Sequence, residues 1–240
     1  MARLSFDCYL IVRQDTLSLL DNPAWNALST VHASFAQGNE LAKRYPTDVA
    51  PIAATRDQSP ESYRSLAQLL GPQGTTALAF VTMPHFPAGW NVVRTLPNAQ
   101  MVWNRSAVSE VKRRGEDLSI SHIDEMLALT ELNKLGRFRK RAPELGSYIG
   151  LHESGRLVSM AGEGFRFPGY TEISVVCTHP DYRGRGYASS LVSALIQKIT
   201  RRGETPFLHV GTDNAEAIRV YEKLGFATRL TITFAIVKTS

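Results

Sequence analysis

The sequence has few cysteines and no long apolar run. Its 240 residues include only two cysteines, Cys8 and Cys177, which cannot form a disulfide framework or a metal site of standard spacing. No apolar run approaches the ~18 residues that a membrane-spanning helix needs, and the stretch between Asp7 and Arg13 is too short for a signal peptide. We therefore expect a cytoplasmic chain that stays out of membranes and needs neither disulfides nor metals to fold.

Charge of one sign is also in small excess. Lys and Arg number 27 against 22 Asp and Glu, which gives a net charge of +5, and 43% of the residues are hydrophobic. This composition is typical of a soluble globular protein with a proper core. The mild positive charge suits an anionic ligand, and it is too weak to indicate nucleic-acid binding.

The chain divides into two predicted lobes at a polar stretch, SAVSEVKRRGEDLSI, at residues 106–120. We expect an N-terminal α/β lobe of unknown role at residues 1–110 and a second domain at residues 111–240. In the first lobe, Ser59 and Pro60 suit the N-cap and first position of a helix. The elements predicted there are helices at residues 24–37 and 60–70 and strands at residues 75–83 and 98–104.

The second lobe alternates helices and strands. Its clearest element is a helix at residues 186–202, which carries an apolar stripe at helical spacing. Ser121 begins a capping-box-like helix start, and Gly155 lies in the turn of a hairpin. The resulting order predicts an α/β fold with a mixed sheet. The predicted helices lie at residues 121–132, 186–202 and 215–224, and the strands at 147–152, 156–162, 170–178, 207–210 and 228–237.

The segment HPDYRGRGYASS, residues 179–190, lies between a predicted strand and the start of the clearest predicted helix. A helix start exposes unpaired N–H groups and a partial positive charge, and both favour phosphate. Gly184 and Gly186 allow a positive φ and a close approach of the backbone, while Arg183 and Arg185 add charge and forked donors. The segment therefore predicts a ligand that carries a pyrophosphate.

Two common nucleotide motifs do not fit this segment. A P-loop needs GxxxxGK followed by Ser or Thr, which is absent. A dinucleotide fingerprint needs GxGxxG after the first strand, whereas here Ser189 takes the place of the third glycine and several strands precede it. The remaining alternative to a pyrophosphate site is a glycine-rich turn with a purely structural role.

Two motifs of this lobe resemble those of the GNAT superfamily of N-acyltransferases. Arg183-x-x-Gly186-x-Ala188 is similar to its acetyl-coenzyme A motif, (Gln/Arg)-x-x-Gly-x-(Gly/Ala). DNAEAIRVYEKLGF, residues 213–226, is similar to its second signature, N-x-x-A-x-x-x-Y-x-x-x-G-F. FLHV and VCTHPDYRGRGYA further resemble the FR-type, or glycine-acyltransferase-like, branch. The resemblance covers residues 120–240, and the first lobe is weakly similar to a degenerate GNAT-like half.

The resemblance implies a GNAT-like fold and an acetyl-coenzyme A-dependent N-acyltransferase, in the first place an acetyltransferase. A primary amine of a small molecule, amino acid or peptide would attack the thioester directly in a ternary complex, without a metal. The resemblance also implies the groups that bind the cosubstrate: N–H groups around the pyrophosphate, a strand end beside the pantetheine arm, and an asparagine. These are Val176, Cys177, Thr178, Arg183, Gly184, Arg185, Gly186, Tyr187, Ala188, Ser189 and Asn214.

For catalysis the resemblance implies Tyr221 and Glu172. Tyr221 would donate a proton to the departing thiolate, with a packed core tyrosine as the alternative. Glu172 stands eleven residues before Arg183, at the spacing of the general-base glutamate of histone-type members, and its apolar neighbours suit a base. A solvated or salt-bridged glutamate is the alternative. His209, five residues before Asn214, is a rival base or a histidine hydrogen-bonded within the sheet.

Two other functional classes stay open on the sequence. One is a coenzyme A-binding regulatory module without catalysis. The other is a nucleic-acid binder that uses the basic run Lys134–Arg141, which otherwise forms a solvated loop or part of the acceptor entrance. A homodimer is compatible with the sequence, which determines neither the amine acceptor nor the role of the first lobe.

Overall fold

The computed structural model of the protein describes residues 18–105, 115–136 and 138–240. Cys8, the boundary predicted between residues 110 and 111, and Arg137 of the basic run lie outside the described residues. No helix within the described ranges is long and apolar enough to cross a membrane.

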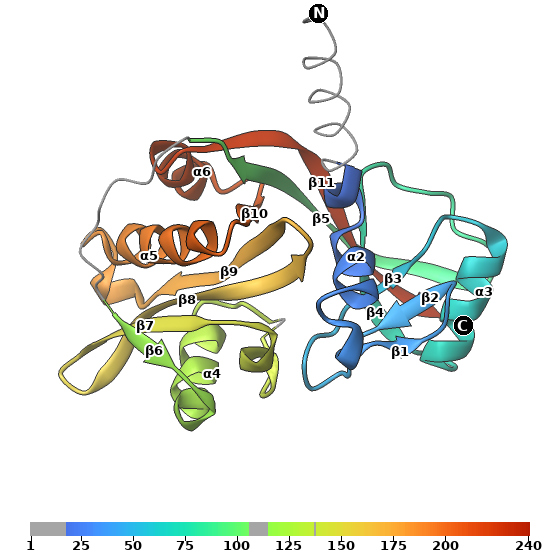
Figure 1. Ribbon diagram of the computed structural model, residues 1–240. Helices are drawn as coiled ribbons and strands as arrows, with labels where there is room; N and C mark the ends of the chain where they lie inside the picture. Colours follow the sequence, from blue (N-terminus) through green and yellow to red (C-terminus); the bar gives the residue numbers. More distant parts are fainter. Residues whose placement is uncertain (1–17, 106–114, 137) are drawn as a thin grey trace, which may run out of the picture.

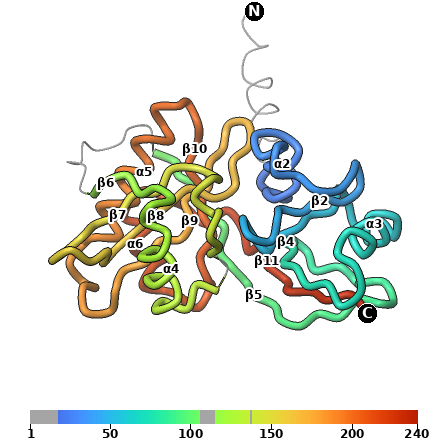
Figure 2. The backbone as a smooth tube through the Cα atoms, turned by 90° about the horizontal axis from the view of Figure 1, so that it is seen from below, coloured from blue at the N-terminus to red at the C-terminus, as the bar shows by residue number. Residues whose placement is uncertain are grey.

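One mixed sheet runs through both predicted lobes (Figure 1). In sheet order its strands are β4 (Thr75–Phe80), β11 (Phe226–Thr239), β5 (Trp90–Trp103), β10 (Thr205–Gly211), β9 (Tyr170–Thr178), β8 (Arg156–Phe167), β7 (Tyr148–Glu153) and β6 (Glu116–Leu118). β9 and β10 pair in parallel, and the other neighbours pair antiparallel. The predicted mixed α/β fold is therefore confirmed. β11, at the end of the chain, lies between two strands of the first lobe, and Figure 2 shows β5 and β11 passing between the lobes.

The helices and a second, small sheet complete the described structure. The helices are α2 (Pro23–Ser29), α3 (Pro60–Leu70), α4 (Ile123–Leu132), α5 (Tyr187–Arg201) and α6 (Ala215–Lys223). Short 3₁₀ turns are η1 (Leu19–Asp21), η2 (Ala33–Phe35), η3 (Ile120–His122), η4 (Ala142–Leu145) and η5 (Pro180–Tyr182). The small antiparallel sheet contains β1 (Gln37–Gly38), β2 (Ala42–Arg44) and β3 (Ala53–Thr55).

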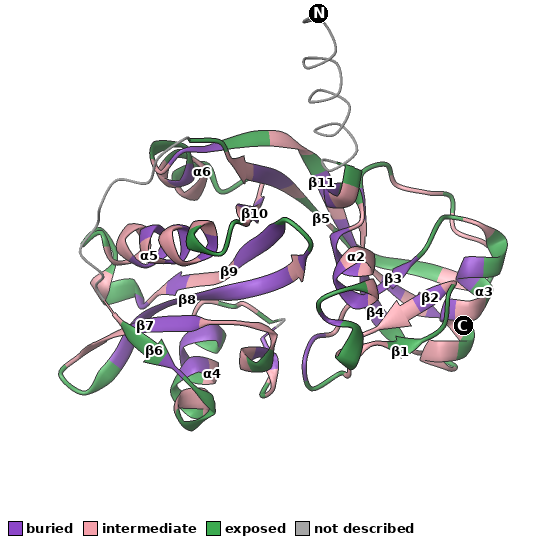
Figure 3. Ribbon diagram, in the orientation of Figure 1, coloured by how far each residue is buried: buried purple, intermediate pink, exposed green. Residues whose placement is uncertain are grey.

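Helices cover both faces of the large sheet. On one face α5 belongs to an apolar cluster that contains Leu195 and Ile173, and α6 packs at its edge. On the other face α2 contributes Leu28 to a cluster with Phe165, and α4 packs in a third cluster that contains Met160. β8 is consequently buried along almost its whole length (Figure 3), as expected for a strand covered on both sides.

Most predicted elements are confirmed. The strand predicted at residues 170–178 is β9 with the same bounds, and the helix predicted at 186–202 is α5, one residue shorter at each end. In the first lobe α3 begins directly after Ser59, whose side chain accepts a hydrogen bond from the N–H of Ser62. The hairpin turn contains Gly155, which has a φ of 77°.

The helix predicted at residues 24–37 is wrong beyond Ser29, where α2 ends. The apolar spacing continues past this point, but the chain leaves the helix and buries His32, whose Nδ1 lies 2.9 Å from the hydroxyl of Tyr45. Burial raises the cost of charging this imidazole and lowers the pKa of His32 to about 4. Tertiary contacts thus override the helical pattern.

Several further boundaries differ from the prediction: the strand predicted at residues 156–162 extends to Phe167, and the strand predicted at residues 75–83 ends at Phe80. The capping box uses Ser119 and His122, not Ser121 and Asp124, and a 3₁₀ turn precedes α4. The strand predicted to begin at residue 98 begins at Trp90, because β11 pairs along the additional residues.

Candidate active site

β9 and β10 part from each other after three residue pairs. Their parallel pairing runs from Tyr170 with Thr205 to Glu172 with Phe207, although both strands continue beyond it. β9 then contains a bulge opposite β8, and Val175 within it has a φ of 53°. A β-branched residue rarely takes a positive φ, and bulges of this kind often occur beside active sites. The strand ends are thereby separated next to the start of α5.

The turn before α5 is open and exposes N–H groups. Gly184 and Gly186 have φ values of 75° and 77°, and a Cβ added at either would meet no atom within 4 Å. Gly186 is the N-cap of α5 and offers no side chain to the first turn. The N–H groups of residues 184–189 find no hydrogen-bond acceptor among the described residues. Unpartnered donors in open space at the start of a 15-residue helix fit a pyrophosphate.

The two arginines of the turn are held beside it. Arg183 donates from Nη2 to Oδ1 of Asn133 at 2.9 Å, and from Nε to the carbonyl of Thr178 at 3.4 Å. The guanidinium of Arg185 stacks over the ring of Tyr182, 4.7 Å from its centroid. Both cations therefore border the open N–H groups and add to the positive field there.

Glu172 and His209, the rival bases, lie in contact with each other. Glu172 is 7% exposed, and its Oε1 lies 2.7 Å from Nδ1 of His209. Its Oε2 accepts a hydrogen bond from the N–H of Phe165 at 3.0 Å. Of the expected alternative, a solvated or salt-bridged Glu172, the solvated form is wrong, because the carboxylate is buried and each oxygen has a partner. The contact with His209 is compatible with the salt-bridged form.

A bulge in β8 builds this site. β8 has one extra residue between Glu163 and Arg166 relative to β9, and this turns the N–H of Phe165 toward Glu172. Gly164 lies beside it, where an added Cβ would come within 2.3 Å of Oε2 of Glu172. Only glycine leaves room for the carboxylate at this position.

We expect Gly164→Ala to lower the rate of the predicted acyl transfer about tenfold or more, because the displaced carboxylate of Glu172, the predicted base, would lose its alignment. Affinity for coenzyme A should stay unchanged, since the turn before α5 is not involved. Steady-state kinetics and calorimetry would measure the two quantities. Gly146→Ala is the matched control, because its Cβ would instead crowd the side chain of Glu163, at 2.6 Å from Cβ and 2.7 Å from Oε2. Equal rate losses in both variants would contradict the expectation.

Comparisons with known proteins agree on one family. The FR47-like protein family matches residues 148–235. A crystal structure of a protein from Novosphingobium aromaticivorans that is assigned to the GNAT family is 34% identical, with a TM-score of 0.85, over 92% of this chain and 98% of that one. The chain belongs to the GNAT family of acetyltransferases.

Other comparisons add the fold and a short conserved region. A GCN5-related N-acetyltransferase from Kribbella flavida shares the fold with a TM-score of 0.60 at 16% identity, over 90% of this chain and 93% of that one. An acetyltransferase from Yersinia pestis (strain Pestoides F) is 50% identical over 56 residues, or 22% of this chain. The match covers 39%, or about two fifths, of the length of this curated relative.

Tyr221, the second predicted catalytic residue of this GNAT chain, is 9% exposed. Burial, with a smaller contribution from the nearby Cys177, raises the pKa of Tyr221 to about 12. Its hydroxyl therefore holds its proton at neutral pH, as a proton donor must. Burial likewise raises the pKa of Cys177 to about 12, so this thiol stays protonated at neutral pH.

The other predicted cosubstrate residues have local structural contacts. Asn214 is the N-cap of α6, and its Oδ1 accepts a hydrogen bond from the N–H of Ala217 at 3.1 Å. In β9, the carbonyl of Cys177 and the hydroxyl of Thr178 contact Oγ of Ser159 at 3.1 and 2.8 Å. The predicted contacts of these residues with coenzyme A stay a prediction.

The basic run is partly engaged within the protein. Arg141 donates to Glu144 at 2.7 Å and to Asp48 of the first lobe at 3.3 Å. The charge-assisted hydrogen bond from Arg141 holds the pKa of Glu144 below its usual value. Phe138 is buried. Part of the run therefore joins the two lobes and is not a freely solvated loop.

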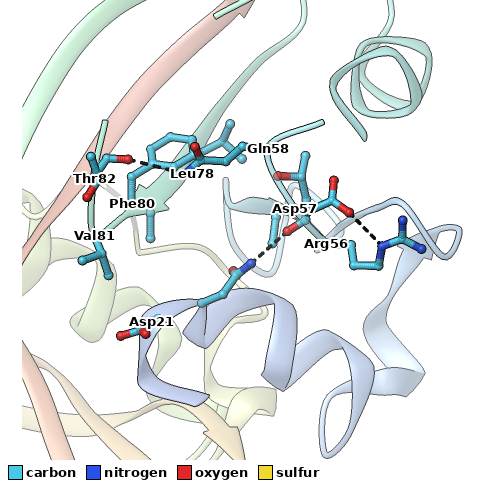
Figure 4. Close-up of a pocket in the computed structure, with 12 residues that line it drawn as sticks. Asp21, Arg56, Asp57, Gln58, Leu78, Phe80, Val81 and Thr82 are labelled. Carbon is cyan, nitrogen blue, oxygen red and sulfur yellow. Dashed lines mark hydrogen bonds and ion pairs between the residues drawn. The ribbon is translucent and has the colours of Figure 1, made fainter. Parts of the chain in front are cut away.

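A separate pocket of about 280 Å³ lies in the first lobe (Figure 4). Hydrogen bonds from Ser59, Ser62 and Arg56 already occupy the carboxylate of Asp57 in its wall, and they hold the pKa of Asp57 well below its usual range. This acid is therefore not available as a base. The pocket contains no predicted site residue; its lining is Asp21, Asn22, Ala54, Thr55, Arg56, Asp57, Gln58, Leu78, Ala79, Phe80, Val81 and Thr82.

The sequence patterns did not identify three residues near Glu172 and His209: Gly164, Gln100 and Arg229. Gln100 is 0% exposed in β5, and its Nε2 lies 3.1 Å from Nε2 of His209. A lone glutamine between apolar residues was the available signal. Its significance depends on strand pairing, which the sequence pattern does not specify.

Proposed function

We propose that the protein transfers an acetyl group from acetyl-coenzyme A to a primary amine of a small molecule, an amino acid or a peptide. The observation that carries the proposal is the open turn at Gly184 and Gly186, with its exposed N–H groups, beside the parted ends of β9 and β10. Membership of the GNAT family supports the same cosubstrate.

The proposed binding mode uses mainly backbone. The N–H groups of residues 184–189 would hold the pyrophosphate, with Arg183 and Arg185 nearby. Residues 176–178 of β9, where β10 has parted from the strand, would lie along the pantetheine arm as a neighbouring strand does. The thioester would then lie near the bulge at Val175, where a strand N–H could stabilise the charge that develops on its oxygen.

The proposed reaction is direct transfer in a ternary complex. Glu172 would take a proton from the ammonium group of the acceptor. The neutral nitrogen would then attack the thioester carbon, so that the N–C bond forms as the C–S bond breaks, and the nitrogen would release its second proton to water to give the neutral amide. Tyr221 would donate a proton to the departing sulfur. Water would then take the proton held by Glu172 and return a proton to Tyr221. An amine of pKa about 10.4 is neutral only about once in 10³ molecules at pH 7, which corresponds to roughly 4 kcal/mol, so a base is valuable.

Tyr221→Phe should lower kcat by only about tenfold or less, because a coenzyme A thiol, with a pKa near 8.5, leaves fairly well without help. Affinity for coenzyme A should not change. Rates measured by thiol release at saturating substrates would check this. A loss of about a hundredfold or more, which falls in the usual range for an essential acid–base group, would contradict a modest role.

The direct test is a screen of amine acceptors with acetyl-coenzyme A, followed by release of the free thiol. We expect acceptor-dependent thiol release for at least one primary amine, and calorimetric heat on addition of coenzyme A alone. A protein that gives neither heat nor a thermal shift with millimolar coenzyme A would overturn the proposal.

A further inference from the structure

Polar side chains form a row across four adjacent strands, on the face of the sheet that α2 covers. In sheet order the strands are β11, β5, β10 and β9, and they contribute Arg229, Gln100, His209 and Glu172. Successive contacts are 2.8 Å from Nη1 of Arg229 to Oε1 of Gln100, 3.1 Å from Gln100 to His209, and 2.7 Å from His209 to Glu172. Burying such polar side chains on an apolar face costs folding free energy unless each of them has a hydrogen-bond partner.

Strand register brings the row together. Gln100 and His209 are direct partners in the antiparallel pairing of β5 and β10. Arg229 is an extra residue of β11, in a bulge between Thr228 and Leu230 opposite β5. The outer end of the row is tied to the first lobe, because Nη2 of Arg229 donates to Asp21 at 2.6 Å.

The hydrogen bonds determine which nitrogen of His209 carries the proton. A guanidinium only donates, so the oxygen of the Gln100 amide faces Arg229. The amide nitrogen then donates to the carbonyl of Leu20 at 2.8 Å and to Nε2 of His209. Nε2 of His209 is consequently the acceptor, and Nδ1–H donates to Glu172.

We infer that His209 is a positioning residue for Glu172, and that Gln100 and Arg229 hold it in this tautomer. The inference rests on the proposed function, in which Glu172 is the base. The lone pair of Nε2 is occupied by Gln100, so His209 does not itself accept the proton of the amine. Its role is to orient one oxygen of Glu172 while the N–H of Phe165 orients the other.

The packing around His209 supports a fixed ring. Phe207 and Phe234 lie edge-on against it, with centroid distances of 5.6 and 5.2 Å and interplanar angles of 87° and 79°. The side chain of His209 is 5% exposed. A ring clamped between two aromatic side chains keeps the donor aimed at Glu172, which is what a positioning role requires.

The first test is ¹⁵N NMR of protein labelled at histidine, which needs no activity. We expect Nδ1 of His209 to give a protonated signal and Nε2 an unprotonated one at neutral pH. Gln100→Glu places an acceptor against Nε2 and should convert that nitrogen to its protonated form. A wild-type His209 with its proton on Nε2 alone would overturn the inference.

The second test compares two replacements of His209. Asn can place an amide N–H near the position of Nδ1, whereas Leu has no donor. We expect His209→Leu to lower kcat about 10- to 100-fold, the value of a hydrogen bond to a charged group, and to move the acid limb of the rate–pH profile. His209→Asn should recover most of the rate and restore the profile. Affinity for coenzyme A should be unchanged in both.

The outcomes separate this inference from the proposed function. If the Asn variant is as slow as the Leu variant, or if neither is slower than the wild type, the positioning role is overturned. If Glu172→Gln also leaves the rate unchanged, the base assignment of the proposed function has failed. The NMR result identifies the tautomer in either case.

Discussion

Gly186→Val is expected to abolish binding of coenzyme A, with a rise in Kd of at least about 100-fold, or roughly 2.7 kcal/mol. Gly186 has a φ of 77°, a left-handed conformation that a β-branched residue adopts only under strain. The new side chain would also project into the open space in front of the exposed N–H groups, where the pyrophosphate is proposed to bind. Isothermal calorimetry with coenzyme A would measure the loss.

Gly203→Val is the matched control for this prediction. Gly203 has a φ of 75°, and an added Cβ there likewise meets no atom within 4 Å. It follows the other end of α5, so the substitution brings the same backbone strain without blocking the turn. We expect a similar loss of thermal stability and unchanged affinity. Retained affinity in Gly186→Val would show that the turn does not hold the ligand.

Glu172→Gln is expected to lower kcat/KM about 10²- to 10⁴-fold at pH 7, the usual range for loss of a general base. The glutamine keeps the shape of the side chain but cannot take the proton of the ammonium group. The rate should therefore follow the neutral fraction of the amine and rise about tenfold per pH unit below the pKa of that amine. Rate–pH profiles from thiol release would check this.

The control is Glu163→Gln, which changes a second buried glutamate. Glu163 is 2% exposed and pairs with Arg202 at 2.9 Å, away from the contacts of Glu172. This variant should lose stability, because it weakens a buried ion pair, but its folded fraction should keep the rate–pH profile of the wild type.

A Glu172→Gln, Tyr221→Phe double variant that retains its biological function would instead favour a coenzyme A-binding module without catalysis.

Local patterns predicted the elements that depend on neighbouring residues. The stripe of α5, the cap at Ser59 and the bounds of β9 follow from interactions within a few residues. The turn at Gly184 and Gly186 was predictable for the same reason. The helix predicted beyond Ser29 failed where a distant contact, between His32 and Tyr45, was stronger than the local preference.

The site around Glu172 was only half predictable. Both rival bases were found along the chain, but nothing in their spacing indicated that they touch. Gln100 lies 109 residues from His209 in sequence. Arg229, which lies in a bulge of β11, contacts Gln100. Such contacts depend on strand order and register, which side-chain patterns within one strand do not specify.

The sequence by itself determined most of the long helices and strands, and where a turn could expose N–H groups to a phosphate, because these follow from local backbone preferences. It did not indicate the short strands β1, β2, β3 and β6. Only the tertiary structure decided that Glu172 contacts His209, that Gln100 contacts the other side of His209, and that Arg229 contacts Gln100. It also decided that the last strand joins the two lobes. Each of these depends on strands far apart in the chain becoming neighbours, since a side chain acquires its partners only when the sheet has formed.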